Sequence, residues 1–558
     1  MIKNKNNQIK INLGCGKDKR EGWINVDVFT QFKPDILHDL HKPLPFKNNY
    51  ADYILAQDIL EHFTREELDR VVSSISSVLK IGGILEIRVP NLDDIFERFN
   101  NDSETRNEFI YGTTLETGIF GAHKVGFTKH MLIALMLSHD LVIKSFNRVQ
   151  TNFVVIFQKE NKSFKKKKLV YINQTLGMGG AEVFMRDLLE NLSSMGWKII
   201  VYTNNNRFRQ MLFESKIQVK KINTVVDVIG DWKGLIKGLI LWPILLFEYW
   251  QIIIKENNAN LFLLSGFIEK IIFTPLAKII RKPSVWIEFG PMSTIFTKFL
   301  KLPKVLYFLV KSMPERVITS SYNSKNNLTS EARISLAKLR VVACGRNLKI
   351  AKFESDSINA IQNQSIKNLI VCVSRMEPGK GQDLLVKAFS KVVKAIPKAK
   401  LRIVGEGGFQ DKIAAEVKSY ELEKSVELVG YVKDSMAELK KAQVVVFPSV
   451  WSLEGFGLVL VEALSLGKPL VAFNNGPIPE IINDGENGLL AKNYDVDDLA
   501  NKIIELLSSK KMRNKFSKQA KLDFKEKYVI NIIGKIYSSI LKDSIYYSHA
   551  NLLCKKFH

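Results

Sequence analysis

The stretch Pro448–Leu464 restricts the fold more than any other part of the chain, because it combines a loop, a glycine turn and two carboxylates. The apolar run Val444–Phe447 before it predicts a buried parallel strand. Backbone amides at the start of the following helix suit phosphate or sugar oxygens. Glu454 and Glu462 would repel phosphate, so they suit hydroxyl groups. The stretch therefore predicts a sugar-nucleotide pocket, although an ordinary strand–loop–helix unit capped by Glu454 would fit as well. The expected helix start consists of Gly455, Phe456, Gly457 and Leu458.

A chain of 558 residues is too long for one hydrophobic core. Strand and helix patterns alternate in three blocks, and the second and third blocks each begin with a strand and a loop. We therefore expect an α/β protein with three Rossmann-like doubly wound domains. A fragment 1–160 is expected to fold alone. The expected division is a first domain at 1–160, a basic linker at 161–168, a second domain at 169–365, a third at 366–545 and a tail at 546–558.

The net charge of +24 admits nucleic acid, an anionic membrane face or an acidic substrate as a partner. The lysines are spread out, and no basic stripe is interleaved with aromatic residues, so nucleic-acid binding is disfavoured. The four cysteines are far apart, which predicts neither a disulfide framework nor a metal site. The first residues contain no apolar signal region, so a cytoplasmic location is expected.

The segment Leu235–Ile254 has the length of a membrane-spanning helix. Lys237, Pro243 and Glu248 interrupt it, and charges within hydrocarbon are costly. A core helix, or a helix lying on the membrane surface, is therefore favoured. Together with the positive charge, the segment suggests peripheral contact with the anionic inner face of the cell membrane.

The third block opens with a strand and the basic glycine loop Ser374–Gly381. Arg375 suits bidentate binding of a diphosphate and Lys380 suits binding as a point charge. This order of motifs resembles family 4 glycosyltransferases of the two-Rossmann-domain GT-B type, over about 169–540. The resemblance implies that the last two domains form a GT-B pair. It also implies transfer from a UDP or GDP sugar, with retention of anomeric configuration and without an essential metal.

The same resemblance assigns roles to individual residues. Arg375 and Lys380 would hold the diphosphate, Glu462 the ribose, and Glu454 with the amides of Gly455–Gly457 the donor sugar. In the second block, the loop containing Gly179 and Gly180 would close over the donor phosphates. Relatives often carry histidines in this block, which has none. Glu288 is a candidate for a polar contact at the reacting sugar, with a surface glutamate as the alternative.

The first block resembles class I S-adenosylmethionine-dependent methyltransferases over about 8–159, on the motifs Ile11–Gly16, Trp23–Asp27 and Leu79–Asn91. A glycine turn followed by an acidic residue on the next strand suits a nucleoside cofactor. His62 is interpreted as a structural helix residue, and His123 is not expected to act as a base. The resemblance places S-adenosylmethionine beside Gly14, Cys15, Gly16, Asp27, Asp39, Gln57 and Asp58.

These motifs together predict a bifunctional enzyme of bacterial surface glycan synthesis. It would extend a saccharide or lipid-linked saccharide acceptor and methylate a saccharide. One alternative is a glycosyltransferase whose methyltransferase-like domain serves only for docking. The other is a basic RNA-binding protein with an RNA-methylating domain.

Overall fold

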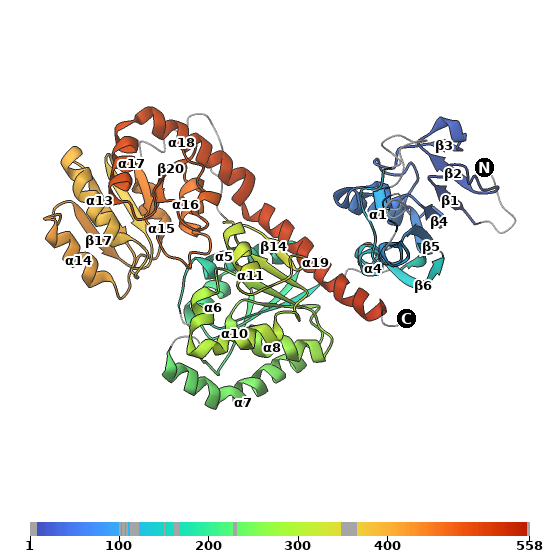
Figure 1. Cartoon of the computed structure of the whole chain (residues 1–558), viewed down its shortest axis with the longest axis horizontal. Helices are drawn as coiled ribbons and strands as arrows, with labels where there is room; N and C mark the ends of the chain where they lie inside the picture. Colours follow the sequence, from blue (N-terminus) through green and yellow to red (C-terminus); the bar gives the residue numbers. More distant parts are fainter. Residues whose placement is uncertain are drawn as a thin grey trace. The chain divides into compact units, whose positions relative to one another are not determined.

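The chain divides into two compact units in the computed structural model (Figure 1). Unit 1 comprises Met1–Lys165 and Lys542–His558, and unit 2 comprises Lys166–Leu541. The structure describes residues 8–554 except 100–101, 103–106, 108–109, 112–121, 150, 161–166, 176, 227–230 and 348–364.

Unit 1 is built on one sheet with the strand order β3-β2-β1-β4-β5-β7-β6. All neighbours are parallel except β7, which is antiparallel to both β5 and β6. The order reverses between β1 and β4, and ligands of such sheets bind beyond the carboxyl ends of the strands at this point. The strands are β1 (Lys10–Leu13), β2 (Ile24–Asp27), β3 (Ile36–Leu37), β4 (Ala51–Gln57), β5 (Leu79–Pro90), β6 (Leu141–Val149) and β7 (Asn152–Lys159).

The helices of unit 1 cover this sheet and complete its core. Thr64 and Glu67 form a reciprocal capping box that fixes the start of α1. The last turns of α19 also belong to this unit, and Ala550 is fully buried in its core. Residues 546–554, expected as part of a tail, are therefore helical. The helical segments are η1 (Thr30–Phe32), η2 (Leu60–His62), α1 (Arg65–Val78), α2 (Leu92–Arg98) and α4 (Lys129–Ser138).

Unit 2 contains two fully parallel sheets, which confirms the expected α/β fold with three doubly wound sheets. The first has the order β10-β9-β8-β11-β12-β13-β14 and reverses between β8 and β11. Its strands are β8 (Lys168–Asn173), β9 (Lys198–Thr203), β10 (Gln218–Lys221), β11 (Leu261–Leu264), β12 (Ser284–Glu288), β13 (Arg316–Thr319) and β14 (Leu339–Val341).

The second sheet of unit 2 has the order β17-β16-β15-β18-β19-β20 and reverses between β15 and β18. Buried aliphatic residues fill its central strands, as expected where helices cover both faces. Its strands are β15 (Leu369–Val373), β16 (Lys400–Val404), β17 (Val426–Gly430), β18 (Val444–Phe447), β19 (Leu470–Phe473) and β20 (Gly488–Ala491).

Helices cover both faces of each of these two sheets (Figure 1). Those of the first half are α5 (Gly180–Ser194), α6 (Asn206–Glu214), α7 (Trp232–Lys255), α8 (Phe267–Ile279), α9 (Ser293–Thr297), η4 (Phe299–Lys301), α10 (Leu302–Val310) and α11 (Tyr322–Ser330). Those of the second half are α13 (Gln382–Ala395), α14 (Gln410–Ser419), α15 (Ser435–Lys441), α16 (Leu458–Ser465), η5 (Ile478–Glu480), α17 (Val496–Ser508) and α18 (Lys510–Asp523).

The chain returns from the second half to the first through the π-helical turn η6 (Phe524–Tyr528) and the long helix α19 (Ile530–Cys554). Within unit 2, α19 packs on α5. The Trp197 indole donates a hydrogen bond to Ser538 Oγ at 2.9 Å, and the Tyr537 ring is buried beside Phe184. This crossing ties the two halves together by a second route besides the connection between β14 and β15.

The predicted basic linker at 161–168 is only partly described. Residues 161–166 lie outside the described residues. Lys168 is the first residue of β8 rather than a solvated linker residue. Its side chain is buried, and its Nζ lies 2.6 Å from Glu256 Oε2. A buried cation is retained here because it has a carboxylate partner.

Candidate functional site

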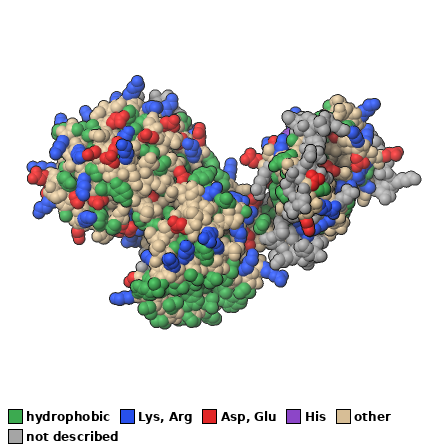
Figure 2. Space-filling view, in the orientation of Figure 1, with side chains coloured by type: hydrophobic (Ala, Val, Ile, Leu, Met, Phe, Trp, Pro, Cys, Tyr) green, Lys and Arg blue, Asp and Glu red, His purple; other side chains and the backbone are tan. Residues whose placement is uncertain are grey.

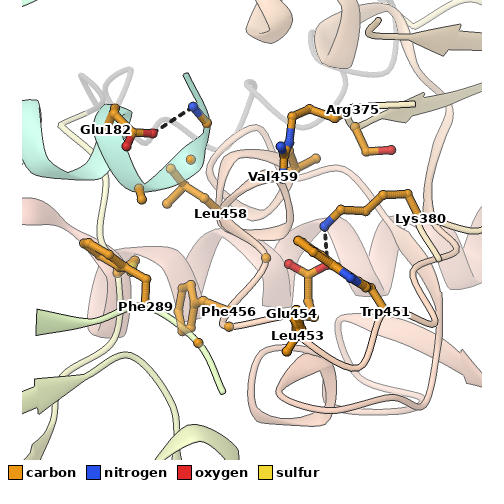
Figure 3. A pocket seen from close by; sticks show the side chains of 18 of the residues that line it. Glu182, Phe289, Arg375, Lys380, Trp451, Leu453, Glu454, Phe456, Leu458 and Val459 are labelled. Atoms are coloured by element: carbon orange, nitrogen blue, oxygen red, sulfur yellow. Dashed lines mark hydrogen bonds and ion pairs between the residues drawn. The ribbon is translucent and has the colours of Figure 1, made fainter. Parts of the chain in front are cut away.

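A cavity of about 490 Å³ lies between the two halves of unit 2, at the carboxyl ends of β8, β12, β15 and β18 (Figure 3). Both strand-order reversals of unit 2 contribute loops to it, so the position is the one expected for a ligand site in such folds. Its lining combines glycines, aromatic rings and a few charged side chains. The residues that carry the chemistry below are Gly179, Gly180, Glu182, Phe289, Arg375, Lys380, Trp451, Glu454, Gly455, Phe456, Gly457 and Leu458.

Lys380 and Glu454 form the polar centre of this cavity. Lys380 Nζ lies 2.8 Å from Glu454 Oε2 (Figure 3). The same oxygen accepts a hydrogen bond from Ser449 Oγ at 2.8 Å. Both side chains are buried. Lys380 also lies 4.0 Å above the Trp451 ring, a cation–π contact. An ammonium group has three donors, and Glu454 takes one, so donors remain for an anionic ligand.

Arg375 lies on the same side of the cavity as Lys380, with its guanidinium 5.8 Å from the centroid of the Trp451 ring. It is the second residue after β15, and its side chain is 51% exposed. Its Nη1 pairs with Glu377 Oε1 at 2.8 Å, so the guanidinium is held loosely at the surface. An exposed guanidinium keeps most of its hydration and can turn toward an arriving phosphate.

The glycine turn before α16 is shaped by close backbone approach. Gly457 has φ of 99°, in the left-handed region that favours glycine, and α16 starts at Leu458, directly after the predicted glycine turn. A Cβ on Gly455 would lie 1.5 Å from the carbonyl oxygen of Phe289, which belongs to the other half of unit 2. Only glycine therefore lets the two halves meet at this point.

A second helix start faces the first across the cavity. The helix α5 begins at Gly180, and a Cβ there would lie 3.1 Å from the Leu458 Cβ. Glu182 accepts a hydrogen bond from the Gly179 amide at 2.8 Å, and burial raises the pKa of its carboxyl group. Two helix N-termini thus lie beside one space, and helix N-termini favour an anion.

Three lining residues escaped the sequence reasoning: Glu182, Phe289 and Trp451. Glu182 stood at the third helical position after Gly179, which is the usual position of a capping glutamate. Trp451 is a large aromatic residue in the loop after β18, and this position could have indicated that it lines the site. Nothing local to Phe289 indicated that it would meet Gly455.

Glu462 and Glu288 do not line the cavity. Glu462 is one turn along α16 from Leu458, and its Oε1 lies 3.1 Å from Arg346 Nε. Glu288 is only 3% exposed, so the alternative of a surface glutamate is wrong. It is held by Lys270 Nζ at 2.8 Å and by the Tyr307 hydroxyl at 2.9 Å.

Arg346 connects the two halves of unit 2 beneath the cavity. Its guanidinium pairs with Asp187 on α5 and with Glu462 on α16, and all three side chains are buried. Its backbone pairs with the π-helical turn, because its amide donates to the Tyr528 carbonyl at 2.9 Å. Burial raises the pKa of the Glu462 carboxyl group, and the nearby Arg346 opposes that effect.

In unit 1, the predicted cofactor residues meet at one edge of the sheet. Gly14, Cys15 and Gly16 follow β1, and Asp27 ends β2. The Gly16 amide donates to Asp27 Oδ2 at 2.8 Å, and the Phe29 amide donates to Asp27 Oδ1 at 2.9 Å. Burial, with Asp27 close by, raises the pKa of the Cys15 thiol to about 11, so it stays protonated. The carboxylate therefore faces the glycine turn, as a ribose-binding group would.

The other three predicted residues lie on the flanking strands. Asp39 follows β3 and accepts hydrogen bonds from the His41 amide and ring, which lower the pKa of its carboxyl group. Gln57 ends β4, and Asp58 follows it with φ of 50°. Burial raises the pKa of the Asp58 carboxyl group. Since β3, β2, β1 and β4 are neighbours, all seven residues lie along one sheet edge.

Comparisons with known protein families match both units. A model described as "Glycosyl transferases group 1" matches residues 354–523, and one described as "Methyltransferase domain" matches residues 22–87. Poly(ribitol-phosphate) alpha-N-acetylglucosaminyltransferase of Staphylococcus aureus (strain COL) is 35% identical over 172 residues, which is 30% of this chain and 34% of that protein.

A second relative is poly(glycerol-phosphate) alpha-glucosyltransferase of Bacillus subtilis (strain 168), 38% identical over 165 residues. That match covers 29% of this chain and 24% of that protein, so the chain spans about a third or less of the length of these two relatives.

Among solved structures, Anabaena Alr3699/HepE in complex with UDP and glucose superposes with a TM-score of 0.57 at 19% identity. The superposition covers 67% of this chain and 99% of that one, and shows that the GT-B fold is shared. The chain therefore carries a methyltransferase domain near its N-terminus and a glycosyl transferases group 1 domain, within a GT-B fold, in its C-terminal part.

Proposed function

We propose that unit 2 is a retaining glycosyltransferase that uses a nucleoside-diphosphate sugar, with UDP or GDP as the leaving group. The observation that carries this proposal is the cavity between the two halves, where Lys380, Arg375 and two helix N-termini surround one space. Positive groups fixed around a departing diphosphate stabilise the charge that develops on it. The solved GT-B structure with UDP and glucose supports the same use of the fold.

The cavity residues predicted from the sequence each have a role in this proposal. Lys380 and Arg375 bind the diphosphate, the amides of Gly455–Gly457 bind its oxygens, and the loop with Gly179 and Gly180 closes over it. Glu454, positioned by Lys380 and Ser449, accepts hydrogen bonds from the hydroxyls of the donor sugar. Glu462 is assigned to the ribose and Glu288 to a polar contact near the reacting sugar, although neither residue lines the cavity. None of these roles needs a metal ion.

The acceptor is proposed to be a saccharide or a lipid-linked saccharide of a bacterial surface glycan. The two relatives named above act, by their names, on poly(ribitol-phosphate) and poly(glycerol-phosphate). Such chains have repeated hydroxyls and negative charge, and the net charge of +24 of this chain would attract them.

Replacing Glu462 by alanine is expected to weaken binding of the nucleotide sugar about tenfold or more, because a charged hydrogen bond contributes about 1.5–3 kcal/mol. Calorimetric titration with UDP-glucose, UDP-N-acetylglucosamine and GDP-mannose would measure this and identify the base. Glu505→Ala, in α17 outside the cavity lining, is the control. Unchanged affinity in a folded Glu462→Ala protein would remove the ribose assignment. Failure of the wild-type chain to bind, transfer or hydrolyse any nucleotide sugar would favour the RNA-binding alternative.

The helix α7 gives unit 2 a large exposed apolar face. Of the described residues it is the one helix with the length and hydropathy to cross a membrane, yet only 28% of its apolar window is buried. Figure 2 shows the apolar side chains gathered over the part of unit 2 that contains α7. Glu248 faces inward and accepts hydrogen bonds from the Asn223 and Thr224 amides, which explains one charge in the segment. The exposed members are Trp232, Ile236, Leu239, Ile240, Ile244, Leu246, Phe247 and Ile254.

We propose that this face lies in the interface of an anionic membrane, where the acceptor is anchored. Lys233, Lys237 and Lys255 are exposed or flanking residues of the same helix, so the apolar face carries positive charge for lipid headgroups. The Trp232 ring packs on Phe299 at 4.9 Å, and the next residue, Leu300, is 93% exposed, which extends the face onto η4. This placement makes the protein peripheral at the cytoplasmic side of the membrane.

The double substitution Ile240→Glu with Phe247→Glu is expected to lower binding to phosphatidylglycerol vesicles about tenfold or more. The two side chains are 70% and 61% exposed, so little packing is lost, while two charges enter the apolar face. Co-sedimentation with vesicles measures the effect, and Leu336→Glu, at another exposed apolar position, is the control. Equal binding of the double variant and the wild type would contradict the membrane assignment.

We also propose that unit 1 binds S-adenosylmethionine and methylates a saccharide. The convergence of Gly14, Gly16 and Asp27 at the strand-order reversal supports this, together with the matched methyltransferase domain. The alternative is a docking domain without catalysis. Cofactor binding distinguishes the two, because only a methyltransferase is expected to bind S-adenosylmethionine.

Replacing Asp27 by alanine is expected to weaken S-adenosylmethionine binding about tenfold or more, because the ribose hydroxyls lose a charged acceptor. The measurement is calorimetry on the full chain rather than on fragment 1–160, because that fragment lacks the buried Ala550. Asp69→Ala, at a side chain that is 73% exposed, is the control. If the folded wild-type chain shows no heat of binding at millimolar cofactor, the docking-domain alternative replaces the methyltransferase proposal.

A further inference from the structure

Glu61, His62 and His123 converge in unit 1 although they come from distant segments. Glu61 and His62 belong to η2, directly after β4, and His123 lies on the chain segment that returns to α4. One ligand atom from each residue lies within 4.8 Å of the other two. The two imidazole rings are 5.0 Å apart between centroids and inclined at 61°.

Glu61 is the unusual member of this cluster. It is 2% exposed, and neither carboxylate oxygen has a hydrogen-bond partner among the described residues. A buried carboxylate without a partner is costly. A bound cation would offset this penalty.

The backbone holds these side chains in place. The Glu61 carbonyl accepts hydrogen bonds from the Lys124 and Val125 amides at 2.7 and 3.1 Å, which ties η2 to the segment carrying His123. The His62 ring lies with Nδ1 3.2 Å from the Ala122 carbonyl, a typical outer partner of a ligating imidazole.

We propose that Glu61, His62 and His123 bind one divalent transition-metal ion, with Zn²⁺ the best match. Two imidazole nitrogens and one carboxylate form the donor set of open zinc sites and of non-haem iron sites. Mg²⁺ and Ca²⁺ prefer oxygen-only surroundings, so imidazole ligands disfavour them. The sequence analysis predicted no metal site because the two histidines are too far apart in the chain to form a recognisable spacing.

The site lies at the carboxyl end of β4, next to Gln57 and Asp58, which are proposed to face the methyl donor. Three protein ligands leave a coordination position open for an oxygen atom. We assign this position to a hydroxyl of the methyl acceptor, an assignment that rests on the proposed methyltransferase function. The binding site itself does not rest on that function.

The test is zinc uptake by the full chain, without a histidine tag, after treatment with a chelator. Competition against a chromophoric chelator is expected to show one zinc equivalent per chain. Glu61→Gln and His123→Ala are each expected to weaken binding about 100-fold or more, since even outer partners of a metal contribute about 10–100-fold. His139→Ala is the control, because His139 pairs with Asp69 at 3.0 Å outside the cluster.

Circular dichroism melting would establish that each variant is folded, and zinc should raise the Tm of the wild-type chain but not that of Glu61→Gln. If Glu61→Gln fails to fold, His123→Ala decides alone, because His123 is only partly buried. The proposal is overturned if the folded wild-type chain takes up no zinc, or if the substitutions leave uptake unchanged. Calorimetry with S-adenosylmethionine gives a separate readout, so loss of the methyltransferase proposal would not be mistaken for loss of the metal site.

Discussion

Replacing Lys380 by alanine is expected to lower kcat for sugar transfer about 100- to 1,000-fold, the usual cost of removing one donor that stabilises transition-state charge. Lys380 is the buried cation of the cavity, and its ammonium group has donors beyond the one taken by Glu454. The departing diphosphate carries more negative charge in the transition state than in the bound donor. We therefore expect the loss mainly in kcat rather than in KM.

The measurement is release of the nucleoside diphosphate under saturating donor. Lys387→Ala serves as the matched control, since this lysine on α13 is exposed and lies outside the cavity lining. Removing Lys380 also leaves Glu454 buried without its cation, with Ser449 as its remaining side-chain donor among the described residues. The Tm of the variant must therefore be measured alongside. Wild-type turnover in a folded Lys380→Ala protein would exclude its role at the diphosphate.

Replacing Arg346 by alanine is expected to lower the free energy of unfolding of unit 2 by about 3–5 kcal/mol. Removing one partner of a buried ion pair costs this much because the remaining charge stays buried. Here two carboxylates, Asp187 and Glu462, lose the same guanidinium. They lie on helices from different halves, so the loss should also loosen the contact between the halves.

Denaturation by urea, followed by tryptophan fluorescence, would measure this change. Arg402→Ala is the matched control, because Arg402 also lies between two carboxylates, Glu427 at 2.6 Å and Glu438 at 3.0 Å, but is more exposed. That substitution should cost about 1 kcal/mol or less. An equal decrease in the free energy of unfolding in both variants would contradict the stabilising role assigned to the buried Arg346 ion pairs.

The doubly wound sheets were predictable because parallel strands buried on both faces leave continuous apolar runs, such as Val444–Phe447 and Leu369–Val373. The short strand β3 was missed, since two residues with partly exposed side chains leave no pattern. The glycine positions around Gly457 were predictable for the same local reason, namely that a tight strand-to-helix turn has few sequence solutions.

Contacts between distant segments were not predictable. The sequence placed Lys380 and Glu454 in one pocket but gave no sign that they pair, since 74 residues separate them. Glu462 was recognised because it lies in the same stretch as Glu454, while its partner Arg346 lies in the loop after β14, far from that stretch in the chain. The positions of Glu288 and of the last turns of α19 depend on the elements that pack against them. The local sequence does not predict these packing partners.

The shared helix α19 has a consequence for biosynthesis. The core of unit 1 contains Ala550, which is made only after the whole of Lys166–Leu541. At about 5–20 residues per second, that interval lasts roughly 20–75 s. During this time unit 1 would leave the ribosome without its last core element. A nascent-chain protease assay should therefore find that unit 1 gains its full resistance only after α19 has emerged, although most of unit 1 is encoded first.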